Sequence, residues 1–591
     1  MNITLDYSRD SLFDEQGLLR LRESYMREEE KSPQERFAYV SKAFATDEAH
    51  AQRMYEYSSK HWVSYATPIL SFGRTKKGLP ISCFLNWIDD SAEGLVNTLS
   101  ETNWLSMLGG GVGVGFGIRS SDERSSGVMA HLKIYDASCL AYRQGSTRRG
   151  SYAMYLDISH PDIELFLDIR KPTGDPNLRA QNLHHGINIT DDFMQIIENC
   201  MIDKNANDTW QLKDPHTGEV KKTISAKSLW QKIIDLRMHT GEPYIHFIDT
   251  SNRHLPPWLA KKGLRVRQSN LCSEIILPTD RDRTAVCCLS SLNLEFYDEW
   301  KNHPTFIYDV AMFLDNVLQY FIDNAPDTIA RAKYSAMRER SIGVGALGLH
   351  AYFQKNNIAF EDAEAKIKNK IIFKNIRTKL NEANKMLAVE RGEAPDAVGY
   401  GYRFSHVIAI APNASSSIIM GNTSPSIEPF RANAYRQDTL SGAGINKNRY
   451  LDAILRKKCE ELGLDIQEEW SSIMQNDGSV QHLDYLDDHT KEVFKTAMEI
   501  DQRVIVELAA DRQEYIDQGQ SVNLFFLPTV NIKYLHAVHF MAWKKGLKTL
   551  YYCRSEKIKK ADKVSKQIER EIIEEIDMKA LVEDVCIMCE G

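Results

Sequence analysis

From Thr67 onward, short apolar runs alternate with longer amphipathic segments, and this alternation limits the folds that are open to the chain. The apolar runs include ISCFL, GVGVGFGI, YAMYLDI, HGINIT and HVIAIA. The amphipathic segments between them, such as residues 92–108 and 362–390, have the spacing of helices. Strands that alternate with helices predict an α/β domain built on a parallel sheet or a barrel.

The two ends of the chain have a different texture. Residues 1–65 are charged, poor in β-branched residues and spaced like helices, whereas residues 554–591 are charged and poor in aromatic residues. We therefore expect three parts. They are a helical N-terminal region (1–65), a catalytic α/β domain (66–553) and a flexible C-terminal tail (554–591).

Composition excludes several classes of function. The formal net charge of −8 argues against nucleic-acid binding as the main role. Runs of about 18 apolar residues, which could span a membrane, are absent from the sequence. The N-terminus is acidic and lacks the apolar core of a signal peptide. The ten cysteines of such a chain predict a cytoplasmic protein whose thiols are buried, bind metal or act in redox chemistry.

The segment Ser269–Pro278, with the sequence SNLCSEIILP, is the most informative motif. In an extended segment alternate side chains share one face, so Asn270, Cys272 and Glu274 would point together. An amide, a thiol and a carboxylate would then converge, and the carboxylate could accept a proton from a substrate hydroxyl. The alternative is a buried structural cysteine between two solvated polar residues.

The same segment, NLCSEI followed by Leu277-Pro278-Thr279, resembles the active-site finger loop of the large subunits of ribonucleotide reductases. In that family the central cysteine becomes a thiyl radical that removes the 3′-hydrogen of the ribose. The resemblance implies this role for Cys272. It implies that Glu274 is the base for the 3′-hydroxyl, and that Asn270 holds the sugar and the intermediates.

Replacing a 2′-hydroxyl by hydrogen needs two electrons, which a dithiol can supply by closing to a disulfide. The resemblance assigns this pair to Cys83 and Cys287, although the neighbouring Cys288 keeps the second assignment open. The terminal Cys586-x-x-Cys589 resembles the mobile dithiol that reduces the pair again. A zinc site would need further ligands, and the tail offers none. Cys139, Cys200 and Cys459 are interpreted as small buried hydrophobic residues.

The segment Lys548–Tyr552 ends in two adjacent tyrosines. Such a pair is usually ordinary packing, but here it resembles the dyad that carries a radical from the small subunit to the cysteine. The resemblance therefore implies radical transfer by Tyr551 and Tyr552. It also implies a separate small subunit whose metal cofactor generates the radical, as in class I enzymes.

Two further groups resemble nucleotide sites. The loop after HVIAIA resembles the loop that binds the substrate diphosphate, and a helix start there would expose backbone N–H groups to phosphate. The substrate-binding set implied by the resemblance is Thr67, Ser82, Asn413, Ala414, Ser415, Ser416 and Ser417. Asp90, Ser91 and Arg119, with the loop 143–150, resemble the site where a deoxynucleotide or ATP selects the substrate base. The alternative for these loops is flexible polar surface.

The resemblance covers about residues 20–591 and implies a ten-stranded α/β barrel of the reductase type with the finger loop inside it. It implies ribonucleoside diphosphate substrates, thioredoxin or glutaredoxin as reductant, a homodimer, and no metal or covalent cofactor in this chain. The ATP-cone that precedes many relatives is expected to be absent. A chain without it suits the cytoplasm of a bacterium or of a virus-infected cell.

The sequence leaves three other interpretations to consider. A cobalamin-dependent reductase would need no small subunit, and a catalytically inactive nucleotide-binding regulator would need no redox cysteines. The run Gly343–Gly348 matches G-x-G-x-x-G, but the charged segment before it is not a buried strand, which argues against a dinucleotide-binding fold. It resembles a turn that begins a helix in the reductase family.

Overall fold

Helices make up most of the N-terminal region, as predicted. A computed structural model describes residues 1–74, 78–142, 150–439 and 442–555. The first elements are η1 (Tyr7–Leu12), α1 (Glu15–Ser24), α2 (Pro33–Phe44) and α3 (Glu48–Ser59). Asp14, Ser32 and Asp47 cap the last three helices by accepting backbone N–H groups of the first turn. The domain boundary at residue 65 stays a prediction, and β1 (Val63–Tyr65) already pairs with the central sheet.

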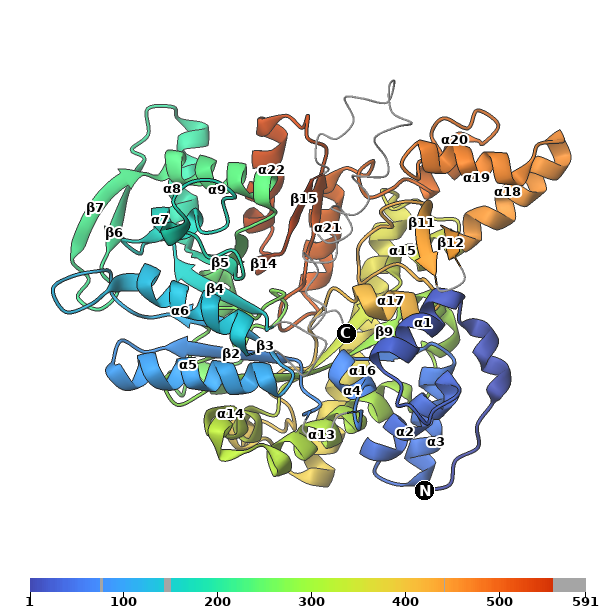
Figure 1. Cartoon of the computed structure of the whole chain (residues 1–591), viewed down its shortest axis with the longest axis horizontal. Helices are drawn as coiled ribbons and strands as arrows, with labels where there is room; N and C mark the ends of the chain where they lie inside the picture. Colours follow the sequence, from blue (N-terminus) through green and yellow to red (C-terminus); the bar gives the residue numbers. More distant parts are fainter. Residues whose placement is uncertain (75–77, 143–149, 440–441, 556–591) are drawn as a thin grey trace.

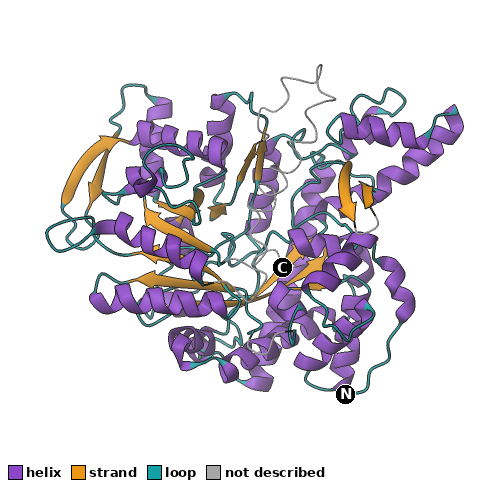
Figure 2. Ribbon diagram, viewed as in Figure 1, coloured by secondary structure: helices purple, strands orange, loops and turns teal. Residues whose placement is uncertain are grey.

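Five parallel strands form the first half of the central sheet (Figures 1 and 2). They are β2 (Cys83–Ile88), β3 (Gly111–Phe116), β4 (Tyr152–Asp157), β5 (His184–Ile189) and β8 (Tyr244–Phe247). Strands β3, β4 and β5 coincide with predicted apolar runs over most of their length, β2 overlaps one in its first half, and β8 lies outside the predicted runs. Long helices lie in the connections between them, as parallel pairing requires. These helices are α5 (Ala92–Met107), α6 (Gly127–Ala141), α8 (Asp191–Ile202) and α9 (Ala226–Thr240).

The strands of the second half run antiparallel to those of the first. Strand β9 (Ala285–Asn293) pairs antiparallel with β2 and parallel with β10 (Ile342–Leu347). Residues 406–411 and 518–522 continue the sheet through single parallel bridges, Val344↔Ile408 and Ile410↔Gln520. Strand β14 (Thr549–Leu550) then pairs with β8, and the Tyr551 N–H donates to the Val522 carbonyl oxygen at 2.9 Å. The chain therefore closes a ring around its centre.

Among the described residues the regular sheet has nine strands, whereas the sequence predicted ten. The difference has a structural cause, because HVIAIA (406–411) pairs through isolated bridges and is not a full strand. The run Gly343–Gly348 also departs from prediction. Most of it is the buried strand β10, and only Gly348, in the left-handed region, begins the helix α15 (Leu349–Lys355).

Helices cover the outside of the second half. The long ones are α13 (Phe306–Asn324), α14 (Ala330–Glu339), α16 (Ala363–Arg391), α21 (Gln502–Gln513) and α22 (Ile532–Lys544). The helices α18 (Arg449–Leu462), α19 (Ile466–Gln475) and α20 (Asp488–Val493) form a lobe at one side, with the hairpin β11 (Ala434–Thr439) and β12 (Gly442–Lys447) (Figure 1). This lobe has its own apolar cluster around Trp470.

Short elements complete the connections. The strands are β6 (Thr209–Lys213), β7 (Val220–Ser225), β13 (Leu524–Phe526) and β15 (Cys553–Ser555). The helices are α4 (Thr67–Leu70), α7 (Ile163–Leu167), η2 (Pro176–Leu178), α10 (Ile248–Arg253), α11 (Pro257–Ala260), η3 (Leu294–Phe296), α12 (Tyr297–Trp300), η4 (Asp327–Ile329), η5 (Pro395–Ala397) and α17 (Ala414–Ile419). Over the described ranges, none of the helices has the length and hydropathy needed to cross a lipid bilayer.

Candidate active site

The finger loop lies inside the ring, and residues 268–279 are all buried. The sequence predicted an extended backbone. Instead the loop turns at residues 271–273, and Ser273 has a φ of 67°. The turn is held from within, because the Asn270 Oδ1 accepts the Ile275 N–H at 3.1 Å and the Ser269 hydroxyl donates to the Ile275 carbonyl at 2.9 Å. The segment is therefore a closed loop and not a strand whose side chains alternate between two faces.

Glycines allow the loop to lie against the sheet. A Cβ atom on Gly113 of β3 would stand 2.1 Å from the Ser269 carbonyl oxygen and 2.7 Å from the Asn270 Cα. A side chain at this position would therefore displace the loop backbone. The lack of a side chain at Gly113 therefore makes room for the finger loop.

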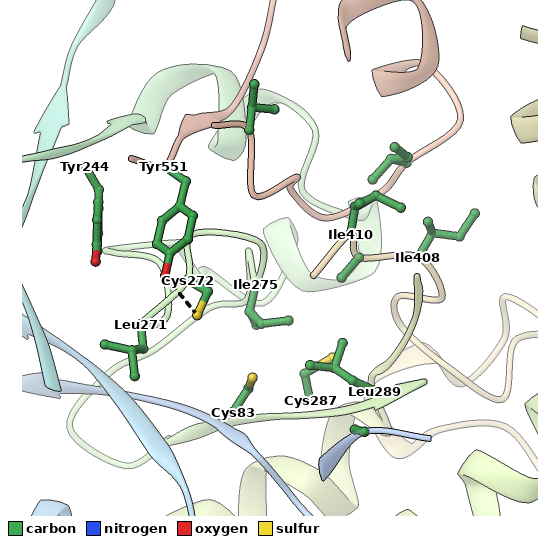
Figure 3. Close-up of a cluster of buried hydrophobic side chains, with 14 of the residues drawn as sticks. Cys83, Tyr244, Leu271, Cys272, Ile275, Cys287, Leu289, Ile408, Ile410 and Tyr551 are labelled. Carbon is green, nitrogen blue, oxygen red and sulfur yellow. Dashed lines mark hydrogen bonds between the residues drawn. The ribbon is translucent and has the colours of Figure 1, made fainter. Parts of the chain in front are cut away.

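Three sulfur atoms share the space beneath the loop (Figure 3). In the antiparallel pair of β2 and β9, Cys83 lies directly opposite Cys287. Successive strand residues point to opposite faces, so Cys288 faces away from the site. This register favours Cys287 over Cys288 as the partner of Cys83. The Cys272 side chain points toward the same region from the loop above.

Polar groups of the loop surround Cys83. The Asn270 amide donates to the Cys83 sulfur at 3.5 Å, and the Cys83 thiol donates to the Glu274 carboxylate at 3.8 Å. The Ser82 hydroxyl is 3.5 Å from the same sulfur. Ser521 donates to the Cys272 carbonyl at 2.6 Å and to the second Glu274 oxygen at 3.2 Å. The predicted amide and carboxylate therefore both contact Cys83.

The two tyrosines connect Cys272 to the outer side of the ring. The Tyr551 hydroxyl donates to the Cys272 sulfur at 3.4 Å, and the ring centroids of Tyr551 and Tyr552 are 4.3 Å apart. A third tyrosine, Tyr244 of β8, lies 4.8 Å from the first ring and 5.1 Å from the second. These contacts form a continuous aromatic path that ends at the thiol.

A buried acid and two histidines lie beside Tyr552. The Tyr552 hydroxyl is 3.3 Å from the His184 Nδ1, which is 2.6 Å from a Glu242 oxygen, and the His185 Nδ1 contacts the second oxygen at 3.0 Å. Burial by itself would raise the pKa of Glu242. Electrostatic interaction with His184 and Arg170, together with the hydrogen bonds from the two histidines, instead holds that pKa well below its usual value. The carboxylate is therefore ionised at neutral pH.

Sequence reasoning missed several of these residues, namely His184, Glu242, Tyr244 and Ser521. None belongs to a motif that was recognised, and only the closing of the ring brings them to the cysteines. The alternation of HGINIT marked β5 as a strand, but nothing in it singled out the histidine before it.

The substrate loop begins a helix, as expected. Asn413 precedes α17 in the left-handed region, with a φ of 56°. Its side chain is fixed to the barrel, because it accepts from the Ser291 hydroxyl at 3.1 Å and donates to the Ala346 carbonyl at 3.0 Å. Ser415 accepts from Arg20 at 2.9 Å, and Thr67, at the start of α4, contacts Tyr25 at 3.2 Å. The N-terminal helix α1 and its C-cap residue Tyr25 thus contact both predicted substrate segments. Ala414, Ser416 and Ser417 are in the same short helix.

The predicted effector residues follow the C-terminal ends of β2 and β3, which we call the edge of the barrel. The Arg119 Nε donates to an Asp90 oxygen at 2.8 Å, and Ser91 caps α5 by accepting the Gly94 N–H at 3.0 Å. Residues 143–149 of the predicted connecting loop lie outside the described residues, as do Cys586 and Cys589. Among the described residues, no group of three or more His, Cys, Asp or Glu side chains is arranged to hold a metal ion.

A ring of two opposed half-barrels around a cysteine-bearing loop defines a recognisable class of enzyme fold. The model of the ribonucleotide reductase barrel domain matches residues 81–398 and 394–553, and that of the ribonucleotide reductase all-alpha domain matches residues 11–78. Ten residues of this sequence precede the all-alpha match.

Individual relatives agree with these matches. The chain is 52% identical to the ribonucleoside-diphosphate reductase large subunit of Invertebrate iridescent virus 3, over the full length of both chains. It is 30% identical to that of Caenorhabditis elegans, over all of this chain and 83% of the relative. The class Id ribonucleotide reductase alpha subunit of Actinobacillus ureae superposes with a TM-score of 0.82 at 36% identity, covering 94% of this chain and 98% of the other.

This chain belongs to the ribonucleotide reductase large-subunit family. It is an oxidoreductase that reduces ribonucleoside diphosphates for deoxyribonucleotide synthesis. As a large subunit, it works with nucleotide substrates and a small subunit.

Proposed function

We propose that this chain reduces ribonucleoside diphosphates through a thiyl radical on Cys272. The observation that carries the proposal is the contact of the Cys272 sulfur with the Tyr551 hydroxyl, above the opposed cysteines Cys83 and Cys287. One side of Cys272 faces a residue that can remove its hydrogen atom, and the other faces a source of two electrons. Burial of the site would protect a radical from water.

The steps follow from the contacts. A radical from the metal cofactor of the small subunit passes through Tyr552 and Tyr551 to Cys272, which removes the 3′-hydrogen of the ribose. Glu274 takes the proton of the 3′-hydroxyl, and Asn270 holds the sugar. The 2′-hydroxyl leaves as water with a proton from one thiol of the Cys83–Cys287 pair, and the other thiol gives its hydrogen to C2′, so that the pair closes to a disulfide. Cys272 then returns the 3′-hydrogen, and Glu274 returns the proton to the 3′-oxygen.

The proposed reductant path uses the C-terminal tail. Cys586 and Cys589 would reduce the Cys83–Cys287 disulfide, and thioredoxin or glutaredoxin would reduce the tail. A tethered dithiol has a high local concentration without a permanent contact. Removing the tail should leave about one turnover per chain unless a small dithiol is supplied. Sustained turnover driven by thioredoxin in the truncated chain would contradict this path.

We propose that the substrate diphosphate binds at the start of α17, near Thr67 and Ser82. We also propose that deoxynucleotides or ATP bind near Asp90, Ser91 and Arg119 as specificity effectors. A homodimer is supported by apolar side chains that α5 and its neighbour α6 leave exposed, among them Val96, Trp104 and Ile134. We also propose a cytoplasmic location, which the resemblance to the reductase family implies.

An activity assay tests the proposal. The chain is incubated with CDP, a candidate small subunit and a dithiol, and dCDP is measured. Cys272→Ser should abolish product, by at least about 1,000-fold, while nucleotide binding is retained, because only the sulfur can carry the radical. Appreciable turnover by Cys272→Ser would exclude the thiyl role. Activity with adenosylcobalamin and no small subunit would favour a cobalamin-dependent enzyme, and binding without product would favour a regulator.

A further inference from the structure

Gln518 joins one of the redox cysteines to the finger loop. It lies in the segment 518–522 of the second half-barrel and is fully buried. Its amide oxygen accepts the Ile276 N–H at 3.2 Å, and its amide nitrogen donates to the Ile342 carbonyl at 3.2 Å. Because the first partner is a donor and the second an acceptor, the orientation of the amide is determined by its surroundings.

This orientation leaves one N–H group of the amide for Cys287. The amide nitrogen has two hydrogens, and its second contact is the Cys287 sulfur at 3.4 Å. The Gln518 backbone is also fixed, because its carbonyl accepts from the Lys548 Nζ at 3.0 Å and its N–H donates to Ile408 at 3.2 Å. An N–H directed at sulfur stabilises a thiolate more than a thiol.

The two cysteines of the pair therefore have unequal surroundings. Cys83 directly contacts the Glu274 carboxylate, which accepts its S–H and would repel a negative charge on its sulfur. Asn270 also donates to Cys83. The charge of Glu274 raises the pKa of Cys287 as well, so the difference between the two sulfurs is the direct contact of Cys83 with the carboxylate. Burial raises the pKa of Cys287 well above its usual value, and the hydrogen bond from Gln518 acts in the opposite direction.

We propose that Gln518 is a positioning residue that makes Cys287 the leaving thiolate when the Cys83–Cys287 disulfide is reduced. This inference rests on the proposed function of that pair. An incoming thiolate bonds to the Cys83 sulfur, the disulfide bond breaks, and its electron pair goes to Cys287. The second thiolate of the dithiol then displaces Cys83, and the two protons lost by the dithiol go to the two cysteines.

The experiment traps the first intermediate. A full-length chain with Cys586→Ser and Cys589→Ser is oxidised by one turnover on CDP with the small subunit. It is then treated with 2-mercaptoethanol, quenched with an alkylating agent and digested. Peptide mass spectrometry measures which cysteine carries the mixed disulfide. We expect the adduct on Cys83, in at least about ten-fold excess over Cys287.

Variants of Gln518 make the test specific. Gln518→Met keeps the shape but removes the donor, and should slow reduction about ten-fold and abolish the preference for Cys83. Gln518→Glu, which brings a carboxylate to Cys287, should have at least as large an effect. Gln520→Met is the matched control, because Gln520 is buried in the same segment but bonds Ala509, Gln513 and Arg512. It should retain the preference.

Two results would contradict the inference, and they differ. If the oxidised chain holds no Cys83–Cys287 disulfide, the proposed redox pair fails, and the role of Gln518 fails with it. If the disulfide forms but the adduct is on Cys287, or if Gln518→Met keeps the preference for Cys83, only the role of Gln518 fails.

Discussion

The thiol centre and the Asp90–Arg119 edge lie at opposite ends of the same strand and are built differently. Cys83, at the start of β2, is fully buried and contacts Asn270 and Glu274, which are also fully buried. Asp90 and Arg119 follow the ends of β2 and β3, and their side chains are 14% and 27% exposed. One end of the strand is enclosed by protein, whereas the other is held by an ion pair that water can reach.

The difference suits two kinds of chemistry. Radical transfer needs fixed distances and no water, and these come from a loop held by the barrel on every side. A regulatory site needs groups that a ligand can engage at low cost, and exposed ion pairs contribute only about 0–1 kcal/mol. Substitutions at the centre should therefore have large effects, and those at the edge small ones.

Removing one oxygen from the centre should have the largest effect. Tyr551→Phe keeps the ring but removes the hydroxyl that contacts Cys272, so turnover should fall by at least about 1,000-fold. Tyr244→Phe is the control. It alters a buried ring beside the same tyrosine without touching the sulfur, and should change turnover less than about five-fold. A large loss in both variants would show that the whole aromatic cluster carries the radical.

The next effect tests the buried charge beside Tyr552. Glu242→Gln should lower the free energy of unfolding by about 3 kcal/mol at neutral pH, because it breaks a buried charge network. Because the pKa of Glu242 is lowered in the folded state, its stabilisation is complete above the unfolded value of 4.5 and is lost as the pH falls below it. Chemical denaturation from pH 7 down to about pH 3 measures this loss. If the free energy of unfolding had the same pH dependence in the unsubstituted chain and in Glu242→Gln, an ion pair of Glu242 in the folded state would be excluded.

A smaller effect tests the close contact of strand and loop. Gly113→Ala should cost about 2 kcal/mol and slow turnover, because its Cβ would meet the Ser269 backbone. In the matched variant Gly115→Ala, the nearest atom is the Gln268 side-chain oxygen at 2.8 Å, which can move more easily. Gly113→Ala should therefore unfold at a lower temperature than Gly115→Ala. The reverse order would contradict the close packing of β3 against the finger loop.

The edge should respond least in stability. Arg119→Ala should change the free energy of unfolding by less than about 1 kcal/mol, because a partly exposed pair is screened by water. If the edge binds effectors, the same variant should weaken nucleotide binding there and alter the choice of substrate base. Calorimetric titration with a deoxynucleoside triphosphate, with reduction of CDP and GDP measured in parallel, tests this. Unchanged binding would remove Arg119 from the site.

The apolar runs determined much of the first half-barrel, because each run is long enough to form a paired strand and its connection holds a helix. The second half was harder to predict. HVIAIA looks like a strand but forms single bridges, and the run Gly343–Gly348 looks like a turn but is mainly a strand. Glycine patterns alone do not distinguish a turn from a strand that packs closely against its neighbours.

For the site, the sequence by itself determined which residue types are present: a cysteine between an amide and an acid, further cysteines, and adjacent tyrosines. Only the tertiary structure decided their partners. The register of β2 and β9 placed Cys287, rather than Cys288, opposite Cys83, and ring closure brought Gln518 and Tyr551 to the cysteines. The reason is physical. A motif specifies neighbours along the chain, whereas contacts between distant segments depend on how the strands pair.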